Sequence, residues 1–259
     1  MIKIALSFDD GRSDQYRTFK EILNKKHMPA TLYVTTGYVL KNIDVADCPS
    51  GHTPMTIEQL KEIKTINNFE VSGHGRKHNN DLENFIDGIN DLRQYLDYDN
   101  NDTFGIASPQ CRLNLNDVPA MKEILKKNKI NYIRTGDRFY HNAFIKKVIR
   151  RLNRVIKSSL LFNYVYKDSA VEVSDKDVLH SVIVTKYDTL RMLKKFIKFA
   201  IKSNKSYVLM FHSILKSNED FYNDTYSWDY NKFNVFCDYL KKLEINGIIE
   251  MVKVSEFIK

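Results

Sequence analysis

The stretch Ile2-Lys3-Ile4-Ala5-Leu6-Ser7-Phe8-Asp9-Asp10-Gly11 joins a short apolar run to two acidic residues and a glycine. A continuous apolar run of this length, followed by a turn, is typical of a strand buried on both faces of a parallel sheet. Packing gives a core strand no reason to end in paired carboxylates. The sequence therefore predicts a buried parallel strand whose carboxyl end carries chemistry.

Outward from this strand, short β-like runs alternate with longer stretches of helical period. Further strands are predicted over residues 30–36, 69–73, 103–107, 131–135, 178–185, 206–211 and 248–252. Helices are predicted from Ser13, over 56–66, from about 80, and over 116–128, 142–159, 189–203 and 230–245. This alternation implies a parallel sheet, and seven or eight repeats favour closure into a barrel.

Length and composition bound the class of protein. At roughly 150 residues per domain, 259 residues fit one domain or two. Because no linker interrupts the alternation, we predict an α/β fold with a single domain over residues 1–259. A hydrophobic content of 43% with 12% aromatics excludes a disordered chain, and only 9 Gly and 5 Pro argue against a fibrous one.

Charge, cysteines and hydropathy suggest where the protein works. The three cysteines are far apart and form no CxxC pair, which suits a reducing compartment. No apolar run approaches the ~18 residues of a membrane span, and Asp9-Asp10 interrupts the first run too early for a signal peptide. We expect a cytoplasmic protein. The net charge of +8 permits an anionic partner, but no motif supports nucleic acid, so we expect none.

Ionisable residues gather at three predicted strand ends, where an α/β barrel places its active site. These ends read Ser7-Phe8-Asp9-Asp10-Gly11, Ser72-Gly73-His74-Gly75-Arg76-Lys77-His78 and Val208-Leu209-Met210-Phe211-His212-Ser213. Two histidines four residues apart and one carboxylate match the ligand set of catalytic zinc. A second carboxylate would then supply a base, and a third histidine an acid.

With these motifs the chain resembles the polysaccharide deacetylase family, the NodB-homology carbohydrate esterases, over nearly its whole length. The resemblance implies a distorted (β/α) barrel of about seven repeats. It implies that Asp9 is the catalytic base and that Asp10 binds the metal with His74 and His78. His212 matches the general acid of the family's LxxH motif, and Leu209 the leucine that lines the acetyl-methyl pocket.

The implied activity is metal-dependent removal of an N-acetyl group from an amino sugar. A divalent cation would polarise the amide carbonyl and lower the pKa of water, Asp9 would take the proton, and His212 would protonate the leaving amine. Zn²⁺ is the expected cation, and the same ligands also accept Co²⁺, Ni²⁺ or Mn²⁺. The expected substrate is an N-acetylated saccharide, either a glycan precursor or a lipid-linked sugar.

The third motif departs from the family's R-x-P-Y pattern and reads Ala107-Ser108-Pro109-Gln110-Cys111. Its proline is present, and the backbone N–H of Gln110 is an expected oxyanion donor. The arginine that orients the base is missing, and we hypothesise that Arg134, at the end of the next strand, replaces it. The family's fourth-motif Asp and Trp are not identifiable. Trp228, in a loop after His212, is a candidate sugar contact, although a lone Trp is more often a core residue.

Residues 144–166 combine six basic residues with apolar residues at helical spacing, followed by Leu160-Leu161-Phe162 and Tyr164-Val165-Tyr166. One interpretation is a barrel helix with a basic outer face. The other is a peripheral contact with an anionic membrane, at the inner face of the bilayer.

Two other functions stay open from sequence. One is a deacylase of a small non-sugar amide, and the other is a carbohydrate-binding relative without activity. The sequence leaves the oligomeric state undetermined.

Overall fold

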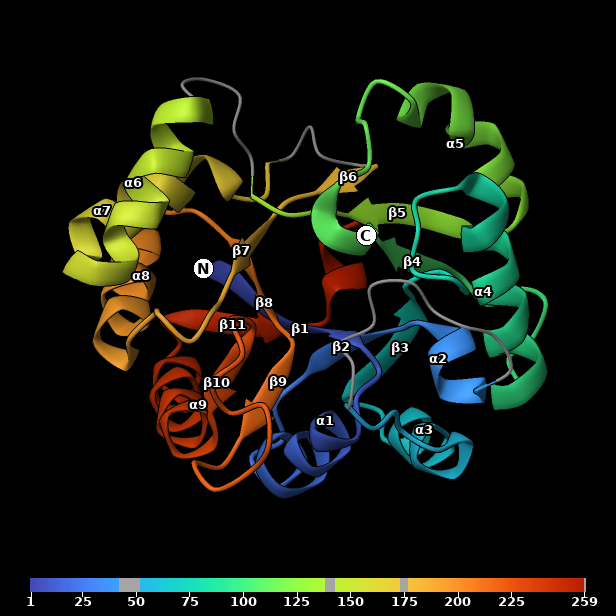
Figure 1. The fold of residues 1–259 in the computed structure, drawn as a ribbon, viewed down its shortest axis with the longest axis horizontal. Helices are drawn as coiled ribbons and strands as arrows, with labels where there is room; N and C mark the ends of the chain where they lie inside the picture. Colours follow the sequence, from blue (N-terminus) through green and yellow to red (C-terminus); the bar gives the residue numbers. More distant parts are fainter. Residues whose placement is uncertain (42–51, 138–142, 173–176, 259) are drawn as a thin grey trace.

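Strand β1 (Ile2–Asp10) lies at the centre of the sheet, as its apolar sequence predicts (Figure 1). A computed structural model describes residues 1–41, 52–137, 143–172 and 177–258. β1 pairs in parallel with β8 (Tyr207–Phe211) along one edge and with β2 (Ala30–Val34) along the other. β11 (Ile249–Val252) pairs with the first residues of β1, below β2.

The sheet continues from β2 and returns to β8, so that it nearly closes. Its order is β6-β5-β4-β3-β2-β1-β8-β7, and every pairing within it is parallel. The remaining strands are β3 (Phe69–Gly73), β4 (Phe104–Ala107), β5 (Ile130–Arg134), β6 (Val178–Leu179) and β7 (Ser181–Ile183). Only His180 separates β6, which pairs with β5, from β7, which pairs with β8. This one interrupted strand bridges the two edges, which confirms the barrel-like α/β fold.

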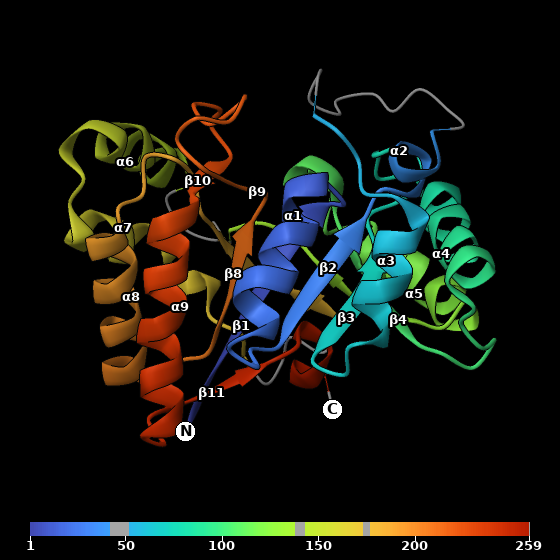
Figure 2. The same ribbon diagram turned by 90° about the horizontal axis from the view of Figure 1, so that it is seen from below.

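Helices cover the outer face of the sheet (Figures 1 and 2). They are α1 (Ser13–Thr18), α2 (Thr36–Leu40), α3 (Ile57–Thr65), α4 (Leu82–Leu96), α5 (Val118–Lys127), α6 (Ala143–Ile156), α7 (Ser159–Tyr166), α8 (Leu190–Ser203) and α9 (Tyr230–Ile245). In Figure 2 the carboxyl ends of β1, β2 and β8 point upward, and α6 lies at that end of the barrel. No helix in the described part of the chain has the length and apolar composition needed to cross a bilayer.

Alternate strand residues face two different cores. Side chains such as Leu6 and Phe8 pack with the helices in the main core. Tyr33 and Tyr132 belong to a smaller cluster, and their hydroxyls meet at 2.9 Å although β2 and β5 are not neighbours in the sheet. These two rings therefore face each other across the barrel interior, which fills its lower part with side chains.

The predicted elements agree with the structure apart from a few details, one of which is that the helix predicted over 142–159 ends at Ile156 and a second helix, α7, follows it. The capping box predicted at Thr56 is present: Gln59 N donates to Thr56 Oγ1 at 3.2 Å, and Thr56 N donates to Gln59 Oε1 at 3.0 Å. The strand predicted over 178–185 is divided at His180, because its halves pair with different neighbours. Helix α2 forms where a loop was expected, and β9 (Ser213–Leu215) pairs with β10 (Ser227–Asp229) beyond β8.

Candidate metal centre and catalytic pocket

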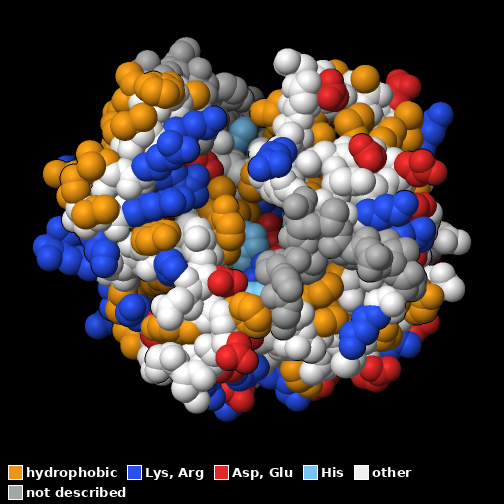
Figure 3. Space-filling view, viewed as in Figure 1, with side chains coloured by type: hydrophobic (Ala, Val, Ile, Leu, Met, Phe, Trp, Pro, Cys, Tyr) orange, Lys and Arg blue, Asp and Glu red, His pale blue; other side chains and the backbone are white. Residues whose placement is uncertain are grey.

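The fold brings the predicted site residues to one rim. Asp9 and Asp10 end β1, His74 follows β3, Arg134 ends β5, and His212 follows β8. Because all these strands are parallel, their carboxyl ends open on the same side of the barrel. A pocket of about 250 Å³ opens there, and its lining includes Asp9, Asp10, His74, His78 and His212. Histidine side chains (pale blue) are visible in the hollow near the centre of Figure 3.

Asp10, His74 and His78 form the candidate metal centre. Asp10 Oδ1 lies 3.5 Å from His74 Nε2 and 3.5 Å from His78 Nε2, and the three ligand atoms lie within 4.8 Å of one another. In a tetrahedral site with bonds of about 2.1 Å, ligand atoms are about 3.4 Å apart. The three buried donors are therefore consistent with a small divalent cation, as the sequence predicts.

Neighbouring groups orient these donors. His74 Nδ1 donates to the carbonyl oxygen of Ala107 at 2.9 Å, which leaves the lone pair of Nε2 directed at Asp10. Arg12 Nε and Nη2 donate to Asp10 Oδ2 at 2.9 and 2.6 Å, and its Nη1 donates to Ser213 Oγ at 2.9 Å. Arg12 thus holds one carboxylate oxygen of Asp10 and leaves the other for the cation.

The charge state of Asp10 follows from the same contacts. Burial alone raises the pKa of this carboxyl, but Arg12 and the two imidazoles outweigh burial and hold the pKa well below its usual value. Asp10 is therefore ionised, as a metal ligand must be.

Asp9 lies beside the metal centre and pairs with Arg134. Asp9 Oδ2 is 3.9 Å from His74 Nε2, and Asp9 Oδ1 accepts a hydrogen bond from Arg134 Nη2. The Arg134 side chain is fully buried, and its Nη1 donates to Met210 Sδ at 2.8 Å. Burial opposes the charge of Arg134, but Asp9 outweighs burial and raises the guanidinium pKa, so Arg134 stays charged. Arg134, at the end of β5, thus contacts Asp9, and its role in place of the third-motif arginine stays a prediction.

His212 shares the pocket as a neutral imidazole. Burial lowers its pKa from 6.5 to about 4, although the charges of Asp10 and Asp9 act in the opposite direction. Its ring lies 4.9 Å from that of Tyr226. Its buried Nδ1 has no hydrogen-bond partner in the described part of the chain. No described carboxylate therefore plays the part of the unidentified fourth-motif aspartate.

Four residues that line the pocket have unusual backbone conformations. Asp10 has φ +84°, His78 +56°, Gln110 +53° and Cys111 +54°, all in a region that side chains other than glycine rarely occupy. Gln110 lines the pocket, and the buried Pro109 begins the short turn before it. Burial raises the pKa of the Cys111 thiol to about 12, so this neighbouring cysteine stays protonated and is not a nucleophile.

Two expected substrate contacts lie elsewhere. Leu209 is fully buried in the main core and does not line the pocket, because on β8 it alternates with Met210, which does. Trp228 is 3% exposed, its Nε1 donates to the carbonyl of Asp188 at 2.7 Å, and its ring packs against Phe211 and Phe236. The predicted sugar contact at Trp228 is wrong for this structure, because protein side chains occupy the faces of its ring.

Sequence reasoning missed Arg12, Ile183, Met210 and Tyr226, all of which line the pocket. Arg12 directly follows the first motif, and this adjacency was the one available signal. Met210 lies inside the LxxH motif at a position that the motif leaves open, and Ile183 and Tyr226 come from segments without a recognisable motif.

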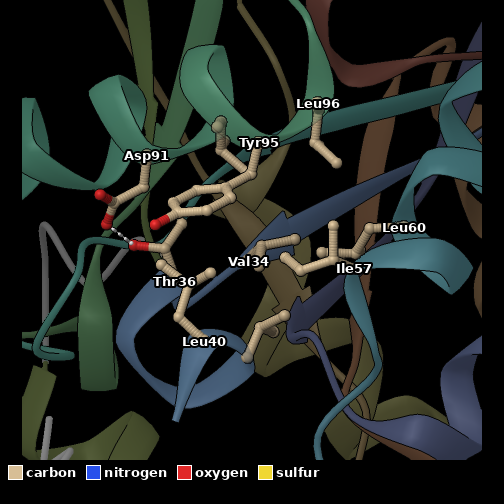
Figure 4. Close-up of a pocket in the computed structure, with 10 residues that line it drawn as sticks. Val34, Thr36, Leu40, Ile57, Leu60, Asp91, Tyr95 and Leu96 are labelled. Carbon is tan, nitrogen blue, oxygen red and sulfur yellow. Dashed lines mark hydrogen bonds between the residues drawn. The ribbon is translucent and has the colours of Figure 1, made fainter. Parts of the chain in front are cut away.

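A second hollow, between α2, α3 and α4, is about 10 Å³ and admits no more than a water molecule (Figure 4). At its edge Thr36 Oγ1 donates to Asp91 Oδ2 at 2.6 Å, and Asp91 also accepts from Arg76 at 2.6 and 2.8 Å. Since Arg76 lies between His74 and His78, this contact anchors the histidine loop to α4.

Comparisons with known proteins agree with this geometry. The family model described as polysaccharide deacetylase matches residues 2–153, which include Asp9, Asp10, His74, His78 and Arg134 but not His212. A search of curated proteins found no match.

Among solved structures, the Bc1960 peptidoglycan N-acetylglucosamine deacetylase is similar at 12% identity with a TM-score of 0.52, over 98% of this chain and 87% of that one. IcaB from Ammonifex degensii is 22% identical with a TM-score of 0.40, over 50% of this chain and 57% of that one. The deacetylase PplD from Streptococcus pyogenes is 25% identical with a TM-score of 0.40, over 51% and 54%.

The chain spans only 54–62% of the length of IcaB, PplD and two further solved structures. The similarity to the Bc1960 deacetylase, by contrast, extends over nearly the whole of both chains and supports the barrel-like fold. With more than half of the chain matched by the family model, the protein belongs to the polysaccharide deacetylase family.

Proposed function

We propose that the protein is a divalent-metal-dependent hydrolase that removes an acetyl group from the nitrogen of an amino sugar. The observation that carries this proposal is one pocket in which the Asp10, His74 and His78 donors adjoin the paired Asp9 and a partly buried histidine, His212. A protein that only bound sugar would need no ion-paired carboxylate beside a metal-ligand set.

A cation held by Asp10, His74 and His78 would supply Lewis acidity to the amide carbonyl and to water, and Zn²⁺ is the proposed ion. Asp9 takes one proton from the attacking water, whose oxygen bonds to the carbonyl carbon. Arg134 donates to Asp9 Oδ1 and fixes the orientation of this carboxylate.

The C–N bond then breaks, and the amine nitrogen receives a proton from His212. Burial leaves this imidazole neutral at pH 7 in the free protein, with a pKa of about 4. We therefore expect His212 to take a proton from solvent water only when the bound substrate develops negative charge beside it, and Asp9 to return its own proton to solvent after the amine has left. Acetate and a free amino sugar are the products, and the balance needs no reactant besides water.

The apolar part of the lining suggests where the acyl methyl group lies. Ile183 and Met210 are its aliphatic side chains, and we propose that they contact the methyl group in place of Leu209. The backbone N–H of Gln110, on the same lining, is the proposed donor to the developing oxyanion. A pocket of about 250 Å³ admits an acetylated sugar ring more readily than a long acyl chain.

We propose residues 1–259 as one deacetylase domain, since β11 near the end of the chain pairs with β1 near its beginning. The substrate is a glycan or glycan precursor, in keeping with a relative described as a peptidoglycan N-acetylglucosamine deacetylase. The cytoplasmic location expected from the sequence stays a prediction, which cell fractionation tests.

Acetate release from a panel of N-acetylated saccharides, measured with the apo protein and after addition of Zn²⁺, tests the function. We expect a chelator to abolish acetate release and Zn²⁺ to restore it. We also expect Asp9→Asn and His78→Gln to eliminate acetate release. The matched control is His27→Asn, because His27 is exposed and has no place in the pocket. If the protein bound stoichiometric metal but hydrolysed only small non-sugar amides, the assignment of a sugar substrate would be contradicted. If it bound metal and hydrolysed nothing, the proposal that it is an enzyme would be contradicted.

A further inference from the structure

Helix α6 presents its apolar side chains outward. Phe144 is 79% exposed, Val155 81% and, at the start of α7, Leu160 80%. The same surface includes Ile145, Val148, Leu152 and Ile156, all about half exposed. We call these seven side chains the α6 apolar face. The six on α6 recur at helical spacing along this helix, which is about 21 Å long, and Leu160 follows on α7.

The polar side of α6 faces the protein and fixes this orientation. Lys146 is 2% exposed and pairs with Asp168, and Arg150 pairs with the buried Asp137 at 3.1 Å. Asn153 is also buried, and its Oδ1 accepts from Ser158 N at 2.7 Å. Turning the apolar face inward would break these pairs and leave buried charges uncompensated, so outward exposure is built into the fold.

Basic side chains border the apolar face. Lys147, Arg151, Arg154 and Lys157 are all exposed, and the whole chain carries a net charge of +8. Figure 3 shows the hydrophobic side chains at the upper left, over α6 and α7, with a band of Lys and Arg beside them. The outer face of this helix is therefore apolar with a basic border, which differs from the basic outer face of an ordinary barrel helix.

We propose that α6 lies flat on an anionic lipid bilayer, with its apolar face in the boundary between headgroups and acyl chains. Apolar residues bordered by Lys and Arg are what such a surface binds. A second copy of this chain is the poorer occupant, because a two-fold contact would bring equal basic borders together without acidic partners.

The rest of residues 144–166 sharpens the contact surface. Phe162, Val165 and Tyr166 of α7 are buried in the main core, so these three residues of the segment do not reach the lipid. Helix α6 lies at the carboxyl ends of the strands (Figure 2), the end where the metal-site pocket opens. Docking on α6 would therefore place the pocket close to sugars attached to the membrane. This last consequence rests on the proposed function, whereas the docking itself does not.

Sedimentation of the full chain with vesicles tests the docking without an activity assay. We expect binding to vesicles that contain phosphatidylglycerol at low salt, at least tenfold weaker binding at high salt, and little to pure phosphatidylcholine. The double variant Val155→Ser/Leu160→Ser should bind at least tenfold more weakly. Val235→Ser/Ile245→Ser is the matched control, because both residues are exposed apolar residues of α9.

An independent readout uses fluorescence. Trp228 is the sole tryptophan and is buried, so Phe144→Trp introduces one exposed reporter whose emission should shift to the blue with anionic vesicles. Absence of binding to anionic vesicles, or equal loss in both double variants, would overturn the proposal. A dimer detected by light scattering would also overturn the proposal if Val155→Ser/Leu160→Ser dissociated it, because the α6 apolar face would then bind a second copy of the chain.

Discussion

Replacing Arg134 with methionine removes the counter-charge of Asp9 while keeping the apolar stem of the side chain. Arg134 is fully buried and Asp9 is 2% exposed, so water cannot substitute for the guanidinium. Breaking a buried ion pair by removing one partner costs about 3–5 kcal/mol. A buried carboxylate without a counter-charge favours its protonated form, so part of this cost would appear as loss of the ionised base.

For Arg134→Met we therefore expect kcat at pH 7 to fall at least a hundredfold, with little change in KM. The acid limb of the pH–rate profile should move upward, so that activity partly returns in alkaline buffer. The assay is acetate release across a pH series, with a thermal melt of each variant to confirm folding. Arg134→Lys, which keeps the charge, should recover part of kcat.

The control is Lys146→Met, which removes a buried cation outside the pocket. It should lower stability without moving the pH–rate profile. A wild-type profile and kcat in Arg134→Met, with Asp9→Asn inactive, would refute the account of Arg134 as the residue that positions the base.

Three further predictions follow from buried contacts. Arg12→Gln should weaken Zn²⁺ binding about 10–100-fold in a competition titration, because Asp10 loses its orienting partner, and unchanged affinity would remove Arg12 from the site. Burial raises the pKa of Asp188 from 3.8 to about 6, so its contribution to stability is present below pH 3.8 and lost as pH rises through 6. From pH 4 to 7 the free energy of unfolding of Asp188→Asn, measured in urea, should thus rise by about 3 kcal/mol relative to that of wild type. Asp220→Asn, at an exposed position, is the control and should show no such rise. Stability curves of Asp188→Asn and wild type that run parallel with pH would contradict this prediction. Trp228→Phe should lower stability by about 1–2 kcal/mol and leave KM for saccharides unchanged, whereas a raised KM would restore Trp228 as a sugar contact.

Much of the fold and metal centre could be predicted because the informative residues are local in sequence. The apolar run of β1 specifies a buried strand, and Asp9-Asp10 marks its carboxyl end. The spacing of His74 and His78 needs only the knowledge that parallel strands end at one rim.

What sequence could not predict depends on contacts between distant segments. Trp228 lies in a polar stretch, and only the pairing of β10 with β9 shows that its ring enters the core. Leu209 and Met210 are adjacent apolar residues, and the pleat of β8 decides which faces the pocket. Helix α2, at five residues, is too short for hydrophobic periodicity to reveal.

The outward face of α6 has a similar origin. Its pattern of apolar and basic residues is visible in sequence, but periodicity does not say which side faces the barrel. Asp168 and Asp137, which hold Lys146 and Arg150 inward, lie outside the helix. The polar partners therefore decide the orientation.

Anomalous diffraction at the zinc edge, from crystals grown with Zn²⁺, tests the central claim most directly. The account predicts one strong peak about 2.0–2.2 Å from Asp10 Oδ1, His74 Nε2 and His78 Nε2. A protein whose acetate release depends on Zn²⁺, but whose peak lies away from these three atoms, would contradict it.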